Sequence, residues 1–224
     1  MSIRSTQIFI FLVSLVVLSC GSETTKPAIS AFDVNAQAGN LKPGDTLFIA
    51  DGLYENVMLD INSIGTSKEP IVICAQTPGS VVLTGNSSMN ISGEYVIISG
   101  LHFNNGFAEK SVISFRSKKG ASLARNARVT SCAITNFSNP DRIHSDHWIE
   151  IYGRENRFDH NHIGTKWNLG ATMVMRLGDS SSTDNHNSID SNYFGPKPRL
   201  GPTCGETLRI VSSANSLQTR GHQL

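Results

Sequence analysis

The stretch Arg157-Phe158-Asp159-His160-Asn161-His162-Ile163 carries the pattern that decides the fold. Its apolar positions, Phe158 and Ile163, lie five residues apart, and the same pair recurs three more times. The first position is occupied by Ile98, Val129, Phe158 and Ile189, and the second by Phe103, Ile134, Ile163 and Phe194. At both positions the copies are separated by 31, 29 and 31 residues. A coil with a fixed rung length requires this agreement, because each inward side chain must stack on its equivalent in the next rung.

The remaining sequence is also typical of an all-β protein. From residue 46 onward, short β-rich runs alternate with glycine, asparagine, serine and proline, and no long segment has helical periodicity. Asn161 and Asn192 occupy equivalent places in the repeat, and Asn104 and Asn136 lie near related corners. Asparagine tolerates a left-handed corner, and its amide can bond the backbone of the next rung. These features predict a β-solenoid with rungs of roughly 30 residues; a turn-rich antiparallel sandwich is the alternative.

Composition sets limits on the partners. The 224 residues are 39% hydrophobic, which is enough for one domain with a sizeable core. A net charge of +1 gives no field that would attract nucleic acid or a charged membrane surface. Recognition of an acidic polymer would therefore depend on a local group of charges.

The first residues have the features of an export signal. Arg4 precedes an uncharged apolar run over residues 8–18, which is too short to span a membrane as a helix. The run ends in Val17-Leu18-Ser19-Cys20, which resembles a bacterial lipobox. We therefore expect residues 1–19 to be a lipoprotein signal peptide, Cys20 to carry the lipid, and residues 20–30 to be a tether. This places the protein in the bacterial cell envelope, anchored to a membrane on the periplasmic or cell-surface side; a plain signal peptide is the alternative.

The other cysteines do not form a disulfide framework. Cys74, Cys132 and Cys204 are odd in number and spread along the chain, although the expected compartment is oxidising. Cys74 and Cys132 lie in strand-like runs, which favours a role as small buried apolar residues.

Two sets of short motifs go beyond the repeat. The first set is Leu41-Lys42-Pro43-Gly44-Asp45-Thr46-Leu47, Asp51-Gly52-Leu53-Tyr54, Gly65-Thr66, Pro70-Ile71 and Gly100-Leu101-His102-Phe103. The second set is Asn156-Arg157-Phe158-Asp159-His160-Asn161, Gly170-Ala171-Thr172, Ile189-Asp190-Ser191-Asn192-Tyr193-Phe194-Gly195-Pro196 and Gly205-Glu206-Thr207-Leu208-Arg209-Ile210. In this order they resemble polysaccharide lyase family 6, which contains chondroitinase B and alginate lyases. The resemblance implies a right-handed parallel β-helix, here over residues 31–224.

The resemblance also implies a reaction, the β-elimination of a uronic-acid polymer, with alginate first and chondroitin or dermatan next. The proton at C5 is weakly acidic, so the sugar carboxylate must be neutralised and a base placed against the proton. In the family, calcium neutralises the carboxylate and is held by an asparagine and two glutamates. Thr203 stands at the position of that asparagine. A threonine hydroxyl is a shorter and weaker calcium ligand.

The family's two glutamates, its lysine base and its arginine belong to later rungs, which would lie beyond Leu224. The resemblance therefore predicts a β-helix whose C-terminal rungs are missing, and we expect these 224 residues alone to be inactive. A non-catalytic carbohydrate-binding or scaffold β-helix is the alternative.

Four polar residues in the matching motifs are candidates for contacts with an acidic polysaccharide: Lys166, Asn168, Glu206 and Arg209. A guanidinium such as that of Arg209 can bind a uronate carboxylate through two parallel hydrogen bonds. An internal ion pair between Glu206 and Arg209 is the alternative.

Two other kinds of chemistry have weaker signals. His160 and His162 lie two apart on an expected strand and could share a face that binds zinc, but polar residues are expected at that corner in any case. Asp141 and Asp146 could serve as the paired carboxylates of a β-helix glycoside hydrolase, in which one protonates the leaving group and the other activates water.

Overall fold

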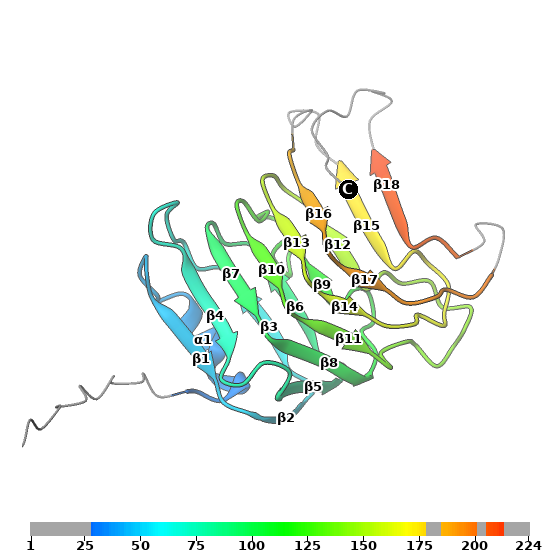
Figure 1. Ribbon diagram of the computed structural model, residues 1–224, viewed down its shortest axis with the longest axis horizontal. Helices are drawn as coiled ribbons and strands as arrows, with labels where there is room; N and C mark the ends of the chain where they lie inside the picture. Colours follow the sequence, from blue (N-terminus) through cyan, green and yellow to red (C-terminus); the bar gives the residue numbers. More distant parts are fainter. Residues whose placement is uncertain (1–27, 178–184, 201–204, 213–224) are drawn as a thin grey trace, which may run out of the picture.

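The protein is a parallel β-helix (Figure 1). A computed structural model describes residues 28–177, 185–200 and 205–212. Within these residues, eighteen strands form three sheets of six parallel strands each, so every turn of the coil, or rung, contributes one strand to each sheet. The coil is right-handed, as parallel crossover connections almost always are. The predicted solenoid is confirmed, and the antiparallel sandwich is wrong.

The three sheets are called A, B and C in the order in which a rung enters them. Sheet A consists of β1 (Thr46–Ile49), β4 (Ile71–Ala75), β7 (Val96–Ser99), β10 (Arg128–Thr130), β13 (Arg157–Asp159) and β16 (Ser188–Asp190). Sheet B consists of β2 (Gly52–Glu55), β5 (Val81–Gly85), β8 (Leu101–Gly106), β11 (Ala133–Thr135), β14 (His162–Ile163) and β17 (Tyr193–Phe194). Sheet C consists of β3 (Met58–Ile61), β6 (Ser88–Ile91), β9 (Ile113–Ser114), β12 (Ile149–Ile151), β15 (Met173–Leu177) and β18 (Leu208–Ser212).

The strand register confirms the stacking predicted from the repeat. In sheet A, Val129 is paired with Ile98 and Phe158, and Phe158 is paired with Ile189. In sheet B, the second apolar position pairs in the same way, through Phe103, Ile134, Ile163 and Phe194. Seven of these eight side chains are buried, and the eighth, Phe194, packs partly buried against the same core. The continuous apolar column inside the coil is the main source of its stability.

An asparagine ladder joins the rungs at the corner between sheets A and B. The Asn161 side chain accepts from the Cys132 N–H at 2.9 Å and donates to the Val129 carbonyl at 3.1 Å. Asn192 repeats this one rung later: it accepts from Asn161 N at 2.9 Å and donates to the Phe158 carbonyl at 2.8 Å. The expected amide bonds are thus present. At this corner the left-handed residues are Ser131, His160 and Ser191, which precede Cys132, Asn161 and Asn192. After β11, Asn136 is itself left-handed, as expected for a corner asparagine.

The N-terminal end of the coil is covered by two short helices, η1 (Ala31–Asp33) and α1 (Val34–Ala38). The Asn35 side chain donates to Met58 O at 2.6 Å and accepts from Asp60 N at 2.7 Å, which fastens α1 to β3. Ile29 pairs with Ile49 of β1 in a parallel bridge. Within the described residues, neither helix nor any other has the length and apolarity to cross a membrane.

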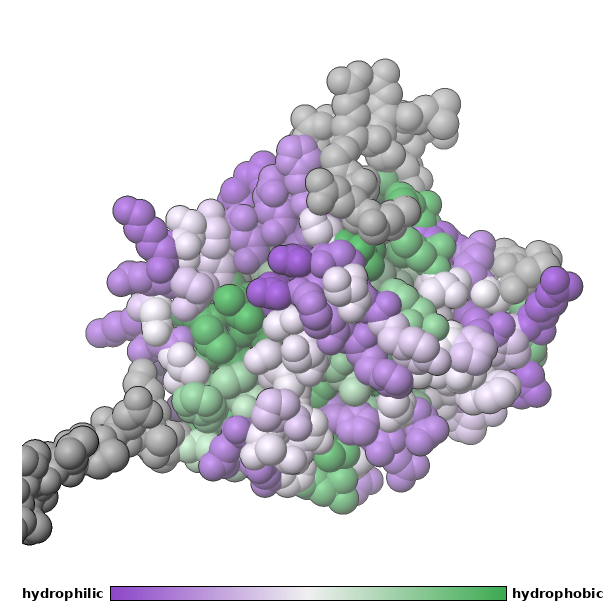
Figure 2. All heavy atoms as spheres, in the orientation of Figure 1, coloured by the Kyte–Doolittle hydropathy of each residue, from purple (hydrophilic) through white to green (hydrophobic). Residues whose placement is uncertain are grey.

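The two cysteines that can be placed belong to strand or corner positions. Cys132 is buried, and burial raises the pKa of its thiol to about 12. Cys74 is partly buried, and burial raises its pKa as well. Both are free, and Cys204 lies outside the described residues. In the orientation of Figure 1, the surface is mostly hydrophilic, with apolar residues in separate patches (Figure 2).

Candidate functional site

The outer face of sheet C gathers charged and aromatic side chains from several rungs. We call the following set the arginine face: Arg116, Arg176, Arg209, Glu150, Tyr152 and Glu206. Strand register brings them together, because Ser114, Glu150, Val174 and Arg209 are successive partners in β9, β12, β15 and β18. Residues from positions 116 to 209 of the chain therefore share one surface.

Glu150 organises two of the arginines. Its side chain is buried, and its Oε1 accepts from Arg176 Nε at 3.0 Å and from Arg176 Nη2 at 2.7 Å. Its Oε2 lies 3.9 Å from Arg116 Nη2. Both arginine side chains are about one third exposed. One buried carboxylate thus fixes two cations that still reach solvent.

The aromatic ring of Tyr152 lies close to the same two arginines. The Arg116 guanidinium carbon lies 4.2 Å from the centre of the Tyr152 ring, and that of Arg176 lies 6.0 Å away. A cation over an aromatic face is attracted by the ring quadrupole. Burial, and next the charge of Glu150, raise the pKa of the Tyr152 phenol, so this group stays neutral.

Glu206 and Arg209 form an ion pair with each other, which was the alternative to a role in binding the polysaccharide. Each side chain is about one third exposed, so the pair lies at the surface beside Val174. Nearby, His147 Nδ1 lies 3.1 Å from the Ala171 carbonyl and therefore donates to it. Burial lowers the pKa of His147, so its imidazole is neutral near pH 7.

Lys166 and Asn168 do not lie on this surface. Lys166 is 1% exposed and Asn168 is 0% exposed. The Lys166 ammonium lies 2.7 Å from Asp146 Oδ1 and donates to Asn168 Oδ1 at 3.0 Å and to Leu169 O at 2.6 Å. This geometry does not place the two side chains along a polymer groove, as the sequence had predicted. Instead they hold the loop after β14 together, because a buried ammonium requires a full set of oxygen partners.

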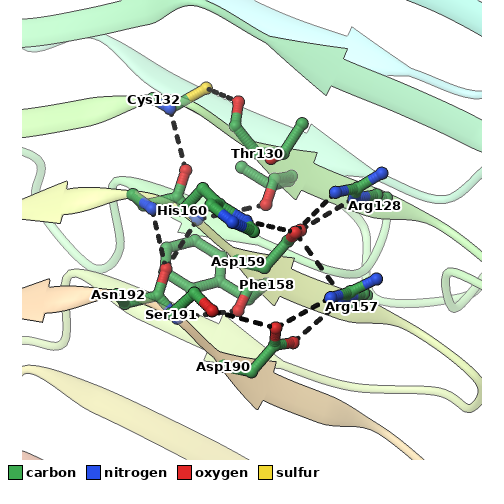
Figure 3. Close-up of polar contacts among 12 residues, drawn as sticks. Arg128, Thr130, Cys132, Arg157, Phe158, Asp159, His160, Asp190, Ser191 and Asn192 are labelled. Atoms are coloured by element: carbon green, nitrogen blue, oxygen red, sulfur yellow. Dashed lines mark hydrogen bonds and ion pairs between the residues drawn. The ribbon is translucent and has the colours of Figure 1, made fainter.

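The residues considered for zinc are separated by the corner. His160 has a left-handed backbone and its Nδ1 lies 2.7 Å from Asp159 Oδ2 (Figure 3), whereas the His162 ring stacks on Tyr193 at 4.7 Å. Within the described residues, no three histidine, cysteine or acidic side chains are grouped so that they could hold a metal ion.

The carboxylates considered for a hydrolase have structural partners. Asp146 is buried against Lys166, and Asp141 is exposed and accepts from the N–H of Ile143 in its own turn. Because Asp146 is buried, it does not contact a substrate that arrives from solvent.

Calcium does not fit the part of the chain that the structure describes. The acidic groups of the arginine face are already taken, Glu150 by Arg176 and Glu206 by Arg209. Thr203, at the family's asparagine position, lies outside the described residues, as does Cys20.

Comparison with known proteins identifies the family. A family model described as Chondroitinase B matches residues 29–223, which is most of the chain. The chain belongs to polysaccharide lyase family 6. The family 6 alginate lyase AlyGC is 44% identical, with a TM-score of 0.76, over 82% of this chain and 25% of AlyGC. A mannuronic acid specific family 6 lyase from human gut microbiota is 31% identical, with a TM-score of 0.74, over 82% of this chain and 43% of that one.

No curated protein matches the sequence. The family 6 chain described here spans about a quarter of the length of AlyGC and less than half of the gut enzyme. The matching rungs include the complete arginine face, since the family match runs from residue 29 to residue 223.

Sequence reasoning missed Arg116, Glu150, Tyr152 and Arg176. The runs that became β9, β12, β15 and β18 were recognisable as strands. Their partners Ser114, Glu150, Val174 and Arg209 are 36, 24 and 35 residues apart, however, so the repeat of 29 to 31 residues could not have aligned them. Arg116 and Tyr152 follow their strands, so no strand period could have placed them.

Proposed function

We propose that the arginine face binds an acidic polysaccharide built of uronic acids, with alginate first and chondroitin or dermatan next. The observation that carries this proposal is the row of Arg116, Arg176 and Arg209 on one sheet surface, each about one third exposed. The relative AlyGC, 44% identical, is described as an alginate lyase, which supports the choice of polymer.

The spacing of the row suits a polymer better than a small ligand. Neighbouring strands lie about 4.8 Å apart, so cations on β15 and β18 and after β9 extend over three rung steps. An extended chain lying along the coil axis would meet a guanidinium repeatedly. Each guanidinium can bind a carboxylate through two parallel hydrogen bonds. The three arginines outnumber Glu150 and Glu206, so the surface keeps a positive charge for the polymer.

The reaction we propose for the family 6 protein is β-elimination at a uronate. Neutralising the sugar carboxylate lowers the energy of the carbanion-like state at C5, and the arginines can contribute to this. No described residue is assigned as the base: Lys166 is enclosed, and Tyr152 holds its proton too strongly. The described rungs thus supply binding, and a chain that binds without cleaving is the alternative outcome.

The test combines binding and cleavage. Purified protein is titrated calorimetrically with oligosaccharides of alginate, chondroitin and dermatan, and each mixture is followed by the ultraviolet absorbance of a new C4–C5 double bond. Arg209→Ala should weaken binding about tenfold, because a hydrogen bond to a charged group contributes roughly 1.5–3 kcal/mol and this one is partly exposed. Arg154→Ala, which removes an exposed arginine that is not a member of the arginine face, is the control. Failure of every uronan to bind would refute the proposal.

We also propose that Cys20 carries a lipid that anchors the protein in the bacterial cell envelope. The apolar run over residues 8–18 followed by Val17-Leu18-Ser19-Cys20 supports this. Cells expressing the protein and fed a labelled fatty acid should yield labelled protein, and Cys20→Ser should abolish the label. Equal labelling of the two proteins would contradict the anchor.

A further inference from the structure

A second surface feature lies beside the arginine face, toward the N-terminal end of the coil. It is a groove of about 260 Å³ on the outer side of sheet C. Its floor is formed by outward side chains of consecutive strands, with Asn90 of β6 paired with Ser114 of β9, and Ser114 paired with Glu150 of β12. Its walls include Lys110, from the segment before β9, and Lys118, from the turn after it.

The floor contains a polar atom that the protein leaves without a partner. Ser114 is 3% exposed, and its hydroxyl has no hydrogen-bond partner. A buried hydroxyl without a partner costs free energy, so such groups in native proteins usually meet water or a ligand. Ser114 lines the groove, and its hydroxyl, which has almost no exposed surface of its own, lies at the floor.

The walls carry cations that are equally available. Lys110 and Lys118 are exposed, and neither forms an ion pair with another residue that the structure describes. Arg116 also lines the groove and lies 3.9 Å from Glu150. The acidic side chains in the lining are Glu109 and Glu150, and Glu150 is already paired with Arg176. The groove thus has a positive wall above a floor that is rich in hydrogen-bond acceptors.

The two kinds of surface select the chemistry of the occupant. A simple anion would satisfy the lysines but would lie against Glu150 without a donor for it. A neutral sugar would satisfy the floor and leave the lysines unmatched. A uronate residue has both a carboxylate for the cations and hydroxyl groups for Asn90, Ser114 and Glu150. The volume is close to the lower end of small-molecule sites, about 300 Å³, which suits one sugar ring.

We propose that this groove is an accessory subsite that holds one uronate residue of the polymer bound on the arginine face. The groove shares Arg116 and Glu150 with that face, so the two surfaces are continuous. A chain that occupies Arg209 and Arg176 and continues toward the N-terminal rungs enters the groove only when it is long enough. This inference rests on the proposed uronan binding and adds a length requirement to it.

The experiment measures affinity against oligosaccharide length. The full chain is titrated with alginate oligosaccharides from the dimer upward, and with the same series after reduction of the carboxyl groups to alcohols. The double variant Lys110→Gln/Lys118→Gln should bind long oligosaccharides about fivefold more weakly, since each exposed ion pair contributes up to about 1 kcal/mol. It should bind the dimer as the wild type does. Lys119→Gln removes the neighbouring exposed lysine, which does not line the groove, and is the matched control.

A second variant separates an effect on binding from an effect on folding. Ser114→Ala removes the unpartnered hydroxyl, so its thermal unfolding should be unchanged or higher while its affinity for long oligosaccharides falls. Equal affinity of the double variant, Lys119→Gln and wild type for long oligosaccharides would overturn the subsite, even if Arg209→Ala still weakens binding at every length. Absence of binding by the wild type would instead refute the proposed function and, with it, the subsite.

Discussion

Arg128 donates to both carboxylate oxygens of Asp159 across a rung boundary, from Nε at 2.8 Å and from Nη2 at 2.5 Å (Figure 3). Arg157 repeats the contact with Asp190 one rung later, at 2.9 Å and 2.7 Å. Arg157 also lies 3.6 Å from Asp159, so the four side chains form a staggered ladder on the outer face of sheet A. This ladder fastens β10, β13 and β16 from outside while the apolar column fastens them from inside.

Asp159→Asn should destabilise the coil. The Asp159 side chain is 0% exposed, and the substitution keeps its size but removes the charge that faces Arg128, Arg157 and His160. We expect a loss of about 2–3 kcal/mol in the free energy of unfolding, measured by chemical denaturation, because hydrogen bonds to charged groups contribute roughly 1.5–3 kcal/mol. Asp190→Asn, whose side chain is 37% exposed, should cost clearly less, because solvent screens an exposed ion pair. Equal losses of stability in the two variants would contradict the larger contribution that we assign to the buried Asp159.

The same carboxyl makes stability depend on acid. Burial by itself would raise the pKa of Asp159, but hydrogen bonds from Arg128 and His160 outweigh it and hold that pKa below its ordinary value. Its contribution is therefore complete above the unfolded pKa, about 3.9, and is lost as the pH falls through the lower folded value. The difference in unfolding free energy between wild type and Asp159→Asn should shrink below about pH 4. A difference that stays constant from pH 7 to pH 3 would count against this assignment.

Lys166→Met should unfold the protein rather than impair binding directly. It leaves the Asp146 carboxylate buried without its cation, and removing one partner of a buried pair costs about 3–5 kcal/mol. Replacing both, as Lys166→Met/Asp146→Leu, should recover part of that loss. Thermal unfolding of the two variants measures the effect. If Lys166→Met is as stable as wild type but binds uronan more weakly, the enclosed position of Lys166 would have to be abandoned.

Lys197 should be the most reactive lysine near pH 8. Burial, and next the charge of Lys166, lower the pKa of Lys197 to about 8, whereas an ordinary lysine has a value of about 10.4. Its amine donates to Asn168 O at 2.8 Å but is only partly buried. An acylating reagent at pH 8, followed by peptide mapping, should modify Lys197 before the exposed Lys119. Faster modification of Lys119 would contradict the lowered pKa.

The repeat was predictable from the sequence because stacking acts on single side chains at a fixed interval. Ile98, Val129, Phe158 and Ile189 must all be apolar if they form one column, and the spacing between them survives in the linear chain. The corner asparagines were predictable in the same way. Two left-handed residues at the same corner, Ser131 and Ser191, were not, because serine, unlike glycine or asparagine, has no preference for that conformation.

The sequence by itself therefore determined the coil, its rung length and the family to which it belongs. The tertiary structure decided which polar residues face solvent. Lys166 was predicted to contact the polysaccharide. In the structure its ammonium is buried against Asp146, which lies twenty residues earlier in the chain. Arg116, Glu150 and Arg176 had no recognisable relation in the chain, and they meet because successive rungs stack their outward side chains. Burial and charge pairing depend on neighbours in space, and in a solenoid most of these neighbours lie a full rung away in sequence.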